Sequence, residues 1–389
     1  MRSLFFFPIG LAATLFATAT ASADSPSVDT RSWRPSTDPS AGLVLESALT
    51  PGAWNWNAGA WVHYALHPVE AHAPGTDEKV RTVEHALGAD LTLGMGLGKI
   101  AAVGASVPVV VVQSGAPGLP STVMGDVGLH GKATLVPNDQ GGFGLAALGT
   151  ALLPTGARTG FQGDGSTRVG VRLLAEYTLL IVGLEASLGY TLRTEHRTWD
   201  DTEGSVRVGD ELPWTVGAQV RPGLFGLDHD NRQLWELALH GSLPAGPVGP
   251  FGTGDPGSAR LSPMMLALSD RVAVGHQRDF SVLAGVDIGL TAAIGVPTLR
   301  GILALTWAPR EHDQDHDGVP DDVDQCPEIP EDRDGFEDSD GCPEIDDDDD
   351  GIVDSEDKCP RVPGVPQPGD KNGCPLPEGK PATTPPGVH

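Results

Sequence analysis

Aspartates recur at a fixed spacing near the C-terminal end of the chain. One stretch runs from Asp313 to Asp324 and a second from Asp346 to Asp357. Both place carboxylates at positions 1, 3, 5, 9 and 12 of a loop, with glycine at position 6. Calcium takes about six to eight hard oxygen ligands, and a glycine allows the sharp turn that wrapping one cation requires. The spacing therefore predicts two calcium loops.

The predicted ligands also include main-chain carbonyls at loop position 7, held by Val319 and Ile352. A shorter unit between the two full loops lacks the first and last carboxylates, because Pro330 and Gly341 stand there. We expect that unit to share ligands or to bind weakly. The predicted ligands are Asp313, Asp315, Asp317, Val319, Asp321, Asp324, Asp332, Asp334, Asp338, Asp346, Asp348, Asp350, Ile352, Asp354 and Asp357.

Prolines beside the loops exclude the flanking helices of an EF-hand, since proline breaks helices. What remains is a calcium loop followed by Cys-Pro, at Cys326-Pro327 and again at Cys359-Pro360. This phrase resembles the thrombospondin type 3 repeat, a helix-poor calcium-binding repeat closed by disulfides. The resemblance covers residues 310–376 and implies Ca²⁺ as the cofactor.

All four cysteines lie in this region, at Cys326, Cys342, Cys359 and Cys374. An even number in a segment without a hydrophobic core suggests two disulfides. The sequence allows three pairings. We favour 326–342 and 359–374, because each would join neighbouring units. The spacing contains no Cys-x-x-Cys and does not indicate a zinc site.

The negative charge of the protein is concentrated in the same segment. The formal net charge is −27, and residues 311–360 hold 23 Asp and Glu against two basic residues, Arg333 and Lys358. This acidity supplies cation ligands and argues against nucleic acid as a partner, because phosphate contacts need a basic face. A merely solvated acidic tail is the alternative, but it would not repeat a ligand pattern followed by Cys-Pro.

The chain begins with features of an exported protein. Residues 1–23 read as a signal peptide, with Arg2, an apolar run from Leu4 to Phe16 and a cleavage site at Ala21-Ser22-Ala23. We expect a flexible leader over 24–52, where Ser, Pro and Asp are frequent, and a disordered tail over 377–389.

Between residues 53 and 309 apolar residues alternate with small or polar ones, which is the period of strands. We count about twelve such segments and no long amphipathic helix. A soluble β-sandwich would turn the apolar face inward, whereas a membrane barrel turns it toward lipid. Long strands and scarce lysines (Lys79, Lys99 and Lys132) favour a transmembrane antiparallel β-barrel. So do aromatic residues suited to membrane interfaces: Trp54, Trp56, Trp61, Tyr177, Tyr190, Trp214, Trp235 and Trp307.

The stretches Gly125-Asp126-Val-Gly-Leu and Gly141-Gly-Phe-Gly-Leu, and Leu188-Gly-Tyr further on, look like bacterial outer-membrane barrels of the transporter-like type. The order of a barrel and then type 3 repeats is similar to that of OmpA-family proteins. In that family the repeats usually lead to a peptidoglycan-binding domain. The residues after Cys374 are too few for one, and we do not expect it here.

No catalytic signature is present in the sequence, and we do not expect an enzyme. Gly94-Met-Gly-Leu-Gly-Lys99 lacks the residues that complete a phosphate loop, and His63, His67 and His72 read as scattered histidines rather than a metal site. Five charged residues are expected to face the lumen, where they would either tune ion passage or fill the barrel with ion pairs: Asp90, Arg172, Glu176, Glu185 and Arg193.

The sequence therefore predicts an outer-membrane barrel that anchors a calcium-binding spacer or adhesion-type module with a structural role in the cell envelope. An even number of strands would put the repeats in the periplasm. The expected partners are outer-membrane lipid, calcium and, through the repeats, other envelope proteins. A passive channel for small solutes and a soluble secreted calcium-binding adhesive protein remain as alternatives.

Overall fold

The computed structural model divides the chain into two compact units, Met1–Pro309 and Arg310–His389. It describes residues 29–72, 79–98, 100–138, 141–201, 204–228, 230–245, 251, 256–275, 277–309, 315, 317, 319, 324–326, 328–332, 336, 340–369 and 372–376. The predicted signal peptide (1–23) and the predicted disordered tail (377–389) lie outside the described residues. Within the described residues, no helix is both long and apolar enough to cross a membrane.

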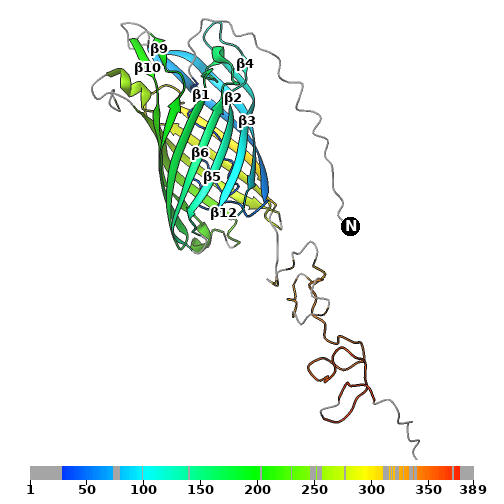
Figure 1. The fold of residues 1–389 in the computed structure, drawn as a ribbon. Helices are drawn as coiled ribbons and strands as arrows, with labels where there is room; N and C mark the ends of the chain where they lie inside the picture. The colour runs from blue at the N-terminus through cyan, green and yellow to red at the C-terminus, as the bar shows by residue number, and fades with distance from the viewer. Residues whose placement is uncertain are drawn as a thin grey trace, which may run out of the picture. The chain divides into compact units, whose positions relative to one another are not determined.

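Antiparallel strands build the first unit (Figure 1). They are β1 (Trp56–His72), β2 (Lys79–Gly96), β3 (Ala101–Gly115), β4 (Thr122–Val123), β5 (Val127–Val136), β6 (Gly142–Leu153), β7 (Arg168–Leu179), β8 (Val182–Arg193), β9 (Arg197–Asp201), β10 (Gly204–Val208), β11 (Glu211–Val220), β12 (Gln233–Pro244), β13 (Met264–Val274), β14 (Phe280–Gly289) and β15 (Leu299–Trp307). Short 3-10 helices lie in three connections, at Arg158–Gly160, Pro222–Phe225 and Pro256–Leu261.

The sheet closes on itself. Strand β1 pairs with β2 on one side and with β15 on the other, from Ala58 opposite Trp307 to Leu66 opposite Leu299. Every other neighbouring pair along the sheet is antiparallel as well. The sheet has 13 strands including the two-residue β4, so twelve strands form the barrel wall. This confirms the predicted antiparallel barrel of about twelve strands.

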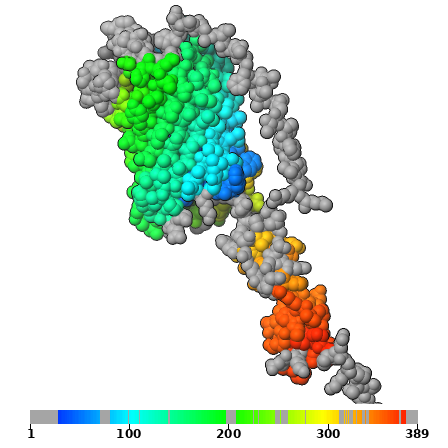
Figure 2. Space-filling model, viewed as in Figure 1, coloured from blue at the N-terminus to red at the C-terminus, as the bar shows by residue number. Residues whose placement is uncertain are grey.

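The outer face of the barrel is apolar. On β8, Leu184, Leu188 and Leu192 are about half exposed, while the alternate residues Glu185 and Ser187 are buried inside. The same alternation holds on β2, β7 and β15. Figure 2 shows one side of the outer surface of the barrel. In water such a continuous apolar face would be unfavourable, whereas lipid solvates it, as in transmembrane barrels.

One of the predicted interfacial aromatic residues is misplaced. Trp54, Trp56 and Trp235 are exposed, as a membrane-interface position requires, but Trp61 is buried inside the barrel. Its ring packs against that of Trp33, with centroids 5.8 Å apart. Trp61 therefore contributes to the interior rather than to an aromatic belt.

The connections at the two ends of the barrel differ in length. At the end where β1 begins and β15 ends, which we call the β1 rim, β7 joins β8 through residues 180–181 alone. At the opposite end, the loop rim, β6 joins β7 through 154–167 and β8 joins β11 through a stretch that contains the β9–β10 hairpin. Bacterial barrels typically have short turns on the periplasmic side and long loops outside.

The expectation of a flexible leader over 24–52 is wrong from residue 29 onward. Residues 29–52, which we call the lumen segment, run inside the barrel from the loop rim to the β1 rim. The Thr30 N–H donates to the Phe161 carbonyl in the β6–β7 connection, 3.1 Å away. Beyond the other end, the Trp54 N–H donates to Gly96 at the end of β2, 2.9 Å away.

Charged side chains of the wall hold the lumen segment along its length. Near its start, Arg31 donates to the Asp90 carboxylate at 2.6 Å. Near its middle, the Glu236 carboxylate accepts the main-chain N–H groups of Val44 and Leu45 at 3.0 and 3.4 Å. A Ser-, Pro- and Asp-rich composition suits a solvated linker, but it suits equally a segment surrounded by buried charges, which must be paired.

One side of the lumen segment is apolar and packs against one part of the wall. Trp33, Leu43 and Leu45 are almost fully buried and form a cluster with side chains of β1, β12, β13, β14 and β15. Among these wall residues are Ala238, Ala267 and Ala304, whose small side chains leave room for the segment. The opposite side of the segment faces β5–β8 and borders a cavity of about 270 Å³, which both charged and apolar side chains line.

The five residues predicted to face the lumen point into it or lie at its edge. Four of them have charged or main-chain partners in the lumen. Arg172 donates to Glu46 at 3.0 Å, and the Glu185 carboxylate accepts the Glu46 N–H at 2.7 Å. Arg193 pairs with Asp164 and Glu211, and Asp90 pairs with Arg31. Glu176 accepts from the Asn138 amide at 3.0 Å. Ion pairs therefore occupy part of the lumen.

The buried lumen segment predicts resistance to protease at a site that a flexible leader would expose. In the folded protein in detergent, trypsin should not cut after Arg31, whereas heat-unfolded protein should be cut there, because cleavage needs local exposure of the backbone. Mass spectrometry of the fragments is the measurement. Arg278, in the exposed β13–β14 turn, is the control site. Equal cleavage after both arginines in the folded protein would contradict the position of the segment.

Candidate functional site

Two disulfides divide the described part of the second unit into neighbouring loops. Cys326 is bonded to Cys342, and Cys359 to Cys374. These are the pairs that we favoured among the three possibilities. No helix or strand is assigned in the described residues of this unit. The disulfides and polar contacts of the acidic loops therefore replace a hydrophobic core.

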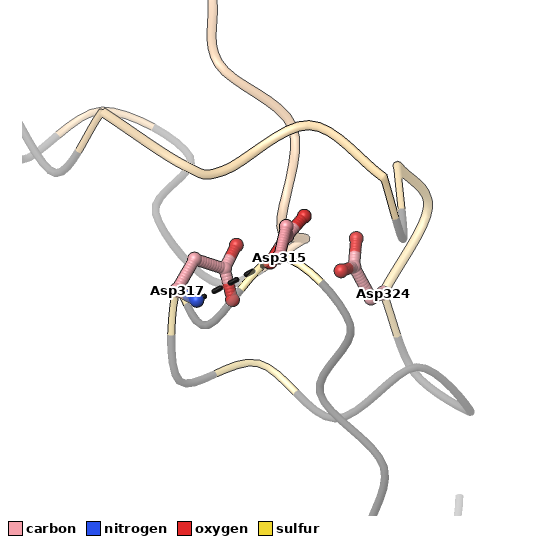
Figure 3. Close-up of side chains that lie close together, drawn as sticks. All are labelled: Asp315, Asp317 and Asp324. Carbon is pink, nitrogen blue, oxygen red and sulfur yellow. Dashed lines mark hydrogen bonds between the residues drawn. The ribbon is translucent and has the colours of Figure 1, made fainter. Parts of the chain in front are cut away.

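The first loop brings together Asp315, Asp317 and Asp324, with one carboxylate oxygen of each lying within 4.8 Å of the others. Figure 3 shows the three side chains turned toward one another from separate points of the loop. Asp317 and Asp324 are buried. Three carboxylates at this separation repel one another unless a cation lies between them.

The second full loop brings together Asp346, Asp348 and Asp350 in the same way, again within 4.8 Å. Glycine is required at its turn, because Gly351 has a φ of +87°. The Gly351 N–H donates to Asp346 at 2.8 Å, and the Ile352 N–H donates to Asp350 at 2.9 Å. Backbone donors thus fix the carboxylates from one side.

The two loops have the same pattern of internal contacts. Asp317 accepts the N–H of Glu331, and Asp350 accepts the N–H of Gly364, with a separation of 14 residues in both cases. The N–H of each Cys-Pro cysteine donates to the aspartate two residues before it, from Cys326 to Asp324 and from Cys359 to Asp357. The repeat in sequence is therefore a repeat in structure.

A glycine from the following unit packs against the last aspartate of each loop. An added Cβ at Gly341 would collide with the Asp324 carboxylate, and one at Gly373 would collide with that of Asp357. Both glycines have positive φ, +78° and +76°, and each precedes the cysteine that closes the disulfide. Gly341 thus confines the carboxylate of a neighbouring loop.

The carboxylates fit a hard divalent cation. Within the described residues, one oxygen of Asp324, of Asp348 and of Asp357 is buried and accepts no hydrogen bond. Desolvation, together with the charges of Asp350 and Asp357, raises the pKa of the Asp348 carboxyl. Oxygen-only ligands with spare lone pairs are what calcium binds, and a cation would neutralise this repulsion.

Eleven of the predicted ligands lie within the described residues, and not all of them gather at a cluster. Asp354 accepts the Asp347 N–H at 3.2 Å instead of joining its neighbours. Val319 and Ile352 are predicted to provide carbonyl oxygens as ligands. Their N–H groups donate to carboxylates of their own loops. Four predicted ligands fall outside the described residues: Asp313, Asp321, Asp334 and Asp338.

A third acidic group consists of Glu331, Asp332 and Glu344. Only Asp332 is among the predicted ligands. The two glutamates lie outside the loop pattern, one after Pro330 and one after Cys342-Pro343. The Cys326–Cys342 bond joins the units that contribute them. A glutamate directly after Cys-Pro was the available signal in the sequence.

Residues 311–334 and 331–367 match the thrombospondin type 3 repeat family. This confirms the resemblance stated for the C-terminal region. No curated protein matches the chain as a whole.

Solved structures resemble the first unit at low identity. An outer-membrane channel from Pseudomonas putida F1 is 11% identical and has a TM-score of 0.49, with 68% of this chain and 99% of that chain covered. The NanC porin is 8% identical with a TM-score of 0.39 and coverages of 66% and 99%. A FadL homologue from Pseudomonas aeruginosa is 12% identical with a TM-score of 0.34 and coverages of 74% and 99%.

The fold and the acidic loops together define a class. The chain is a β-barrel with a lipid-compatible outer face, followed by thrombospondin type 3 repeats.

The packing of Gly341 predicts a long-range effect on cation binding. Gly341→Ala should weaken calcium binding by about tenfold or more, because strain at positive φ and displacement of Asp324 together cost roughly 1–3 kcal/mol. Gly369→Ala is the matched control, because Gly369 also has positive φ (+71°) but its added Cβ would meet nothing. Calorimetric titration of the full chain with calcium measures both variants. Equal affinities would exclude the proposed confinement of Asp324.

The ligand assignment predicts a change in stoichiometry. Asp317→Ala and Asp350→Ala should each remove about one bound calcium, since each carboxylate belongs to a different cluster and bound cations depend on their full oxygen set. Equilibrium dialysis with radioactive calcium gives the count. Asp230→Ala, on an exposed connection of the barrel, is the control. An unchanged count in the two loop variants would refute the assignment.

Proposed function

We propose that this protein is an outer-membrane barrel that anchors a calcium-stapled module, with a structural role in the cell envelope. The observation that supports the anchoring role is the lumen segment. Its apolar cluster with the wall and its ion pairs occupy the interior along the barrel. A barrel filled in this way is stable and closed to large solutes, which suits an attachment point better than a wide pore.

Calcium is the cofactor that the repeats are proposed to bind. The acidic clusters, the buried carboxylate oxygens and the family match all support it. When bound, calcium would link separate stretches of a helix-poor chain, and the two disulfides would limit their separation. Affinities are expected near 10⁻⁴–10⁻³ M, roughly the range of extracellular calcium modules.

The periplasm is the proposed location of the repeats. β15 ends at the β1 rim, where the connection from β7 to β8 is short. Short connections belong to the periplasmic side of bacterial barrels, so the chain after Trp307 would emerge there. The module would then be a spacer or a contact surface for other envelope proteins. No catalytic role is proposed.

Calcium removal should loosen the repeats and leave the barrel intact. In the full-length protein in detergent, a chelator should increase trypsin cleavage after Arg361, because the loops lose the cation that offsets carboxylate repulsion. The gel shift between folded and heated barrel should remain. Magnesium is the control cation, and it should protect poorly because it demands a small octahedral site. Equal cleavage with calcium and with chelator would contradict the stapling role.

Cell fractionation separates the anchor from the secreted alternative. The protein should sediment with the outer membrane and require detergent for release, because its outward leucines and valines are solvated only by lipid. An outer-membrane porin and a periplasmic enzyme serve as markers. Recovery in the culture supernatant without detergent would overturn the membrane proposal and favour a soluble adhesive protein.

Passive passage of small solutes is a second candidate function. Two cavities beside the lumen segment favour it, of about 270 and 240 Å³. They are too small for large solutes but have room for hydrated ions. This candidate does not exclude the anchoring role, because an inserted barrel holds the repeats whether or not its lumen conducts.

A further inference from the structure

We propose that the lumen contains a narrow path for small anions, which runs beside the lumen segment and is lined by arginine and lysine side chains. The inference rests on the second candidate function, passive passage, and adds the class of solute. It is independent of the calcium module.

The two cavities together extend along the barrel. The first reaches Pro51, Asn57 and Met95, which lie near the β1 rim. The second reaches Gly209, in the connection before β11, and Pro244, at the end of β12, both at the loop rim. Both have part of their lining in common, including the side chains of Arg34, Arg168 and Thr191. These shared residues therefore lie between the two cavities.

The path exists because the lumen segment is packed to one side. Its apolar residues Trp33, Leu43 and Leu45 cluster with β1 and β12–β15. The wall opposite presents polar and small residues to the first cavity, among them Thr150, Gly170 and Thr191. Apolar side chains such as Leu148 and Val171 line it as well. An interior of this volume with charged and polar groups in its walls can hold water, so ions passing through it would remain partly hydrated.

Cations outnumber carboxylates in the lining. The first cavity has four cationic side chains against two carboxylates, Asp38 and Glu46. The second has five arginines against three carboxylates. The cations of the two cavities are Arg31, Arg34, Lys132, Arg168, Arg172, Arg193 and Arg260.

The carboxylates that pair with these cations either accept hydrogen bonds from them in the cavity lining or lie behind the lining. Asp38 accepts from Lys132 at 2.5 Å, and Glu46 accepts from Arg172 at 3.0 Å. Asp90 and Asp164 pair with the arginines but do not line either cavity. Three carboxylates line the second cavity, and each has a partner: Asp29 pairs with Arg34, Glu211 pairs with Arg193, and Asp210 accepts the Tyr190 hydroxyl at 2.6 Å. A solute in the path therefore meets N–H donors beside carboxylates that are already engaged.

Spare donors remain on Arg172 and Lys132, two of the lining cations. An arginine has five N–H groups and a lysine ammonium three, and one group of Arg172 and one of Lys132 account for their hydrogen bonds to Glu46 and Asp38. Rings of arginine and lysine are the usual lining of anion pores. Chloride, phosphate and small carboxylates share the chemistry that such donors recognise.

The test is the ion selectivity of the full-length protein in a planar lipid bilayer. Under unequal potassium chloride concentrations, the reversal potential should show preference for chloride over potassium. Arg172→Gln should lower that preference by about threefold or more, the effect of removing one partly screened charge close to the path. Arg172 is suited to this substitution because its side chain is 27% exposed. Substituting potassium acetate and potassium phosphate tests the width and the charge that the path accepts.

Two further variants separate the path from a general effect of lumen charge. Arg271→Gln is the matched control, since Arg271 contacts Ala41 and Thr306 and lines neither cavity. It should leave the preference unchanged. Deletion of residues 29–52 should enlarge the conductance and weaken the chloride preference, because Arg31, Arg34 and the lateral packing are lost together.

The outcomes distinguish the inference from the function on which it rests. No current from inserted wild-type protein would refute passive passage and the path with it. Current without anion preference, or with preference for potassium, would refute the anion path alone. Equal loss of preference in Arg172→Gln and Arg271→Gln would also overturn it, because selectivity would then follow total lumen charge rather than the lining of the path.

Discussion

The antiparallel pairing of β1 with β15 is the constraint on which the rest of the first unit depends. It joins the two ends of the sheet, from Ala58 opposite Trp307 to Leu66 opposite Leu299. A closed sheet satisfies every main-chain group of the wall, which lipid requires. It also fixes one face outward and one inward for each strand. Closure therefore explains the alternation of leucine with polar residues on β8, because the apolar residues face lipid and the charged residues face the lumen.

Closure creates a need that the lumen segment meets. The wall turns inward several charges that would be costly if they stayed unpaired in a narrow interior. Arg31 neutralises Asp90, and Glu46 neutralises Arg172. Main-chain groups do the same work, because Glu236 receives the N–H groups of Val44 and Leu45. The chain before the first strand is therefore an integral part of the barrel interior.

The sequence allowed the barrel and the acidic loops to be predicted for the same reason, namely that each pattern is local. A period of two reports directly that alternate side chains have different surroundings. Aspartates within one loop are brought together by the turn at a glycine such as Gly351. Both patterns could be recognised without knowledge of distant contacts.

What could not be predicted depends on contacts between distant parts of the chain. The composition of residues 29–52 does not distinguish a linker in water from a segment whose polar partners are Asp90 and Glu236. The partner of Trp61 inside the barrel is Trp33, which comes from that segment. In the repeats, Glu331 and Glu344 come from two units that the Cys326–Cys342 disulfide joins.

The course of the lumen segment has a consequence for assembly. Its start lies at the loop rim and its end at the β1 rim, with buried ion pairs between them. The lumen segment could enter a closed barrel only with one end leading, and it would have to pass the position of each ion pair in turn. A ring that forms around it meets no such barrier. We therefore expect the wall strands to pack around the segment before β1 pairs with β15. The pairing of the first and last strands would then be the final one to form.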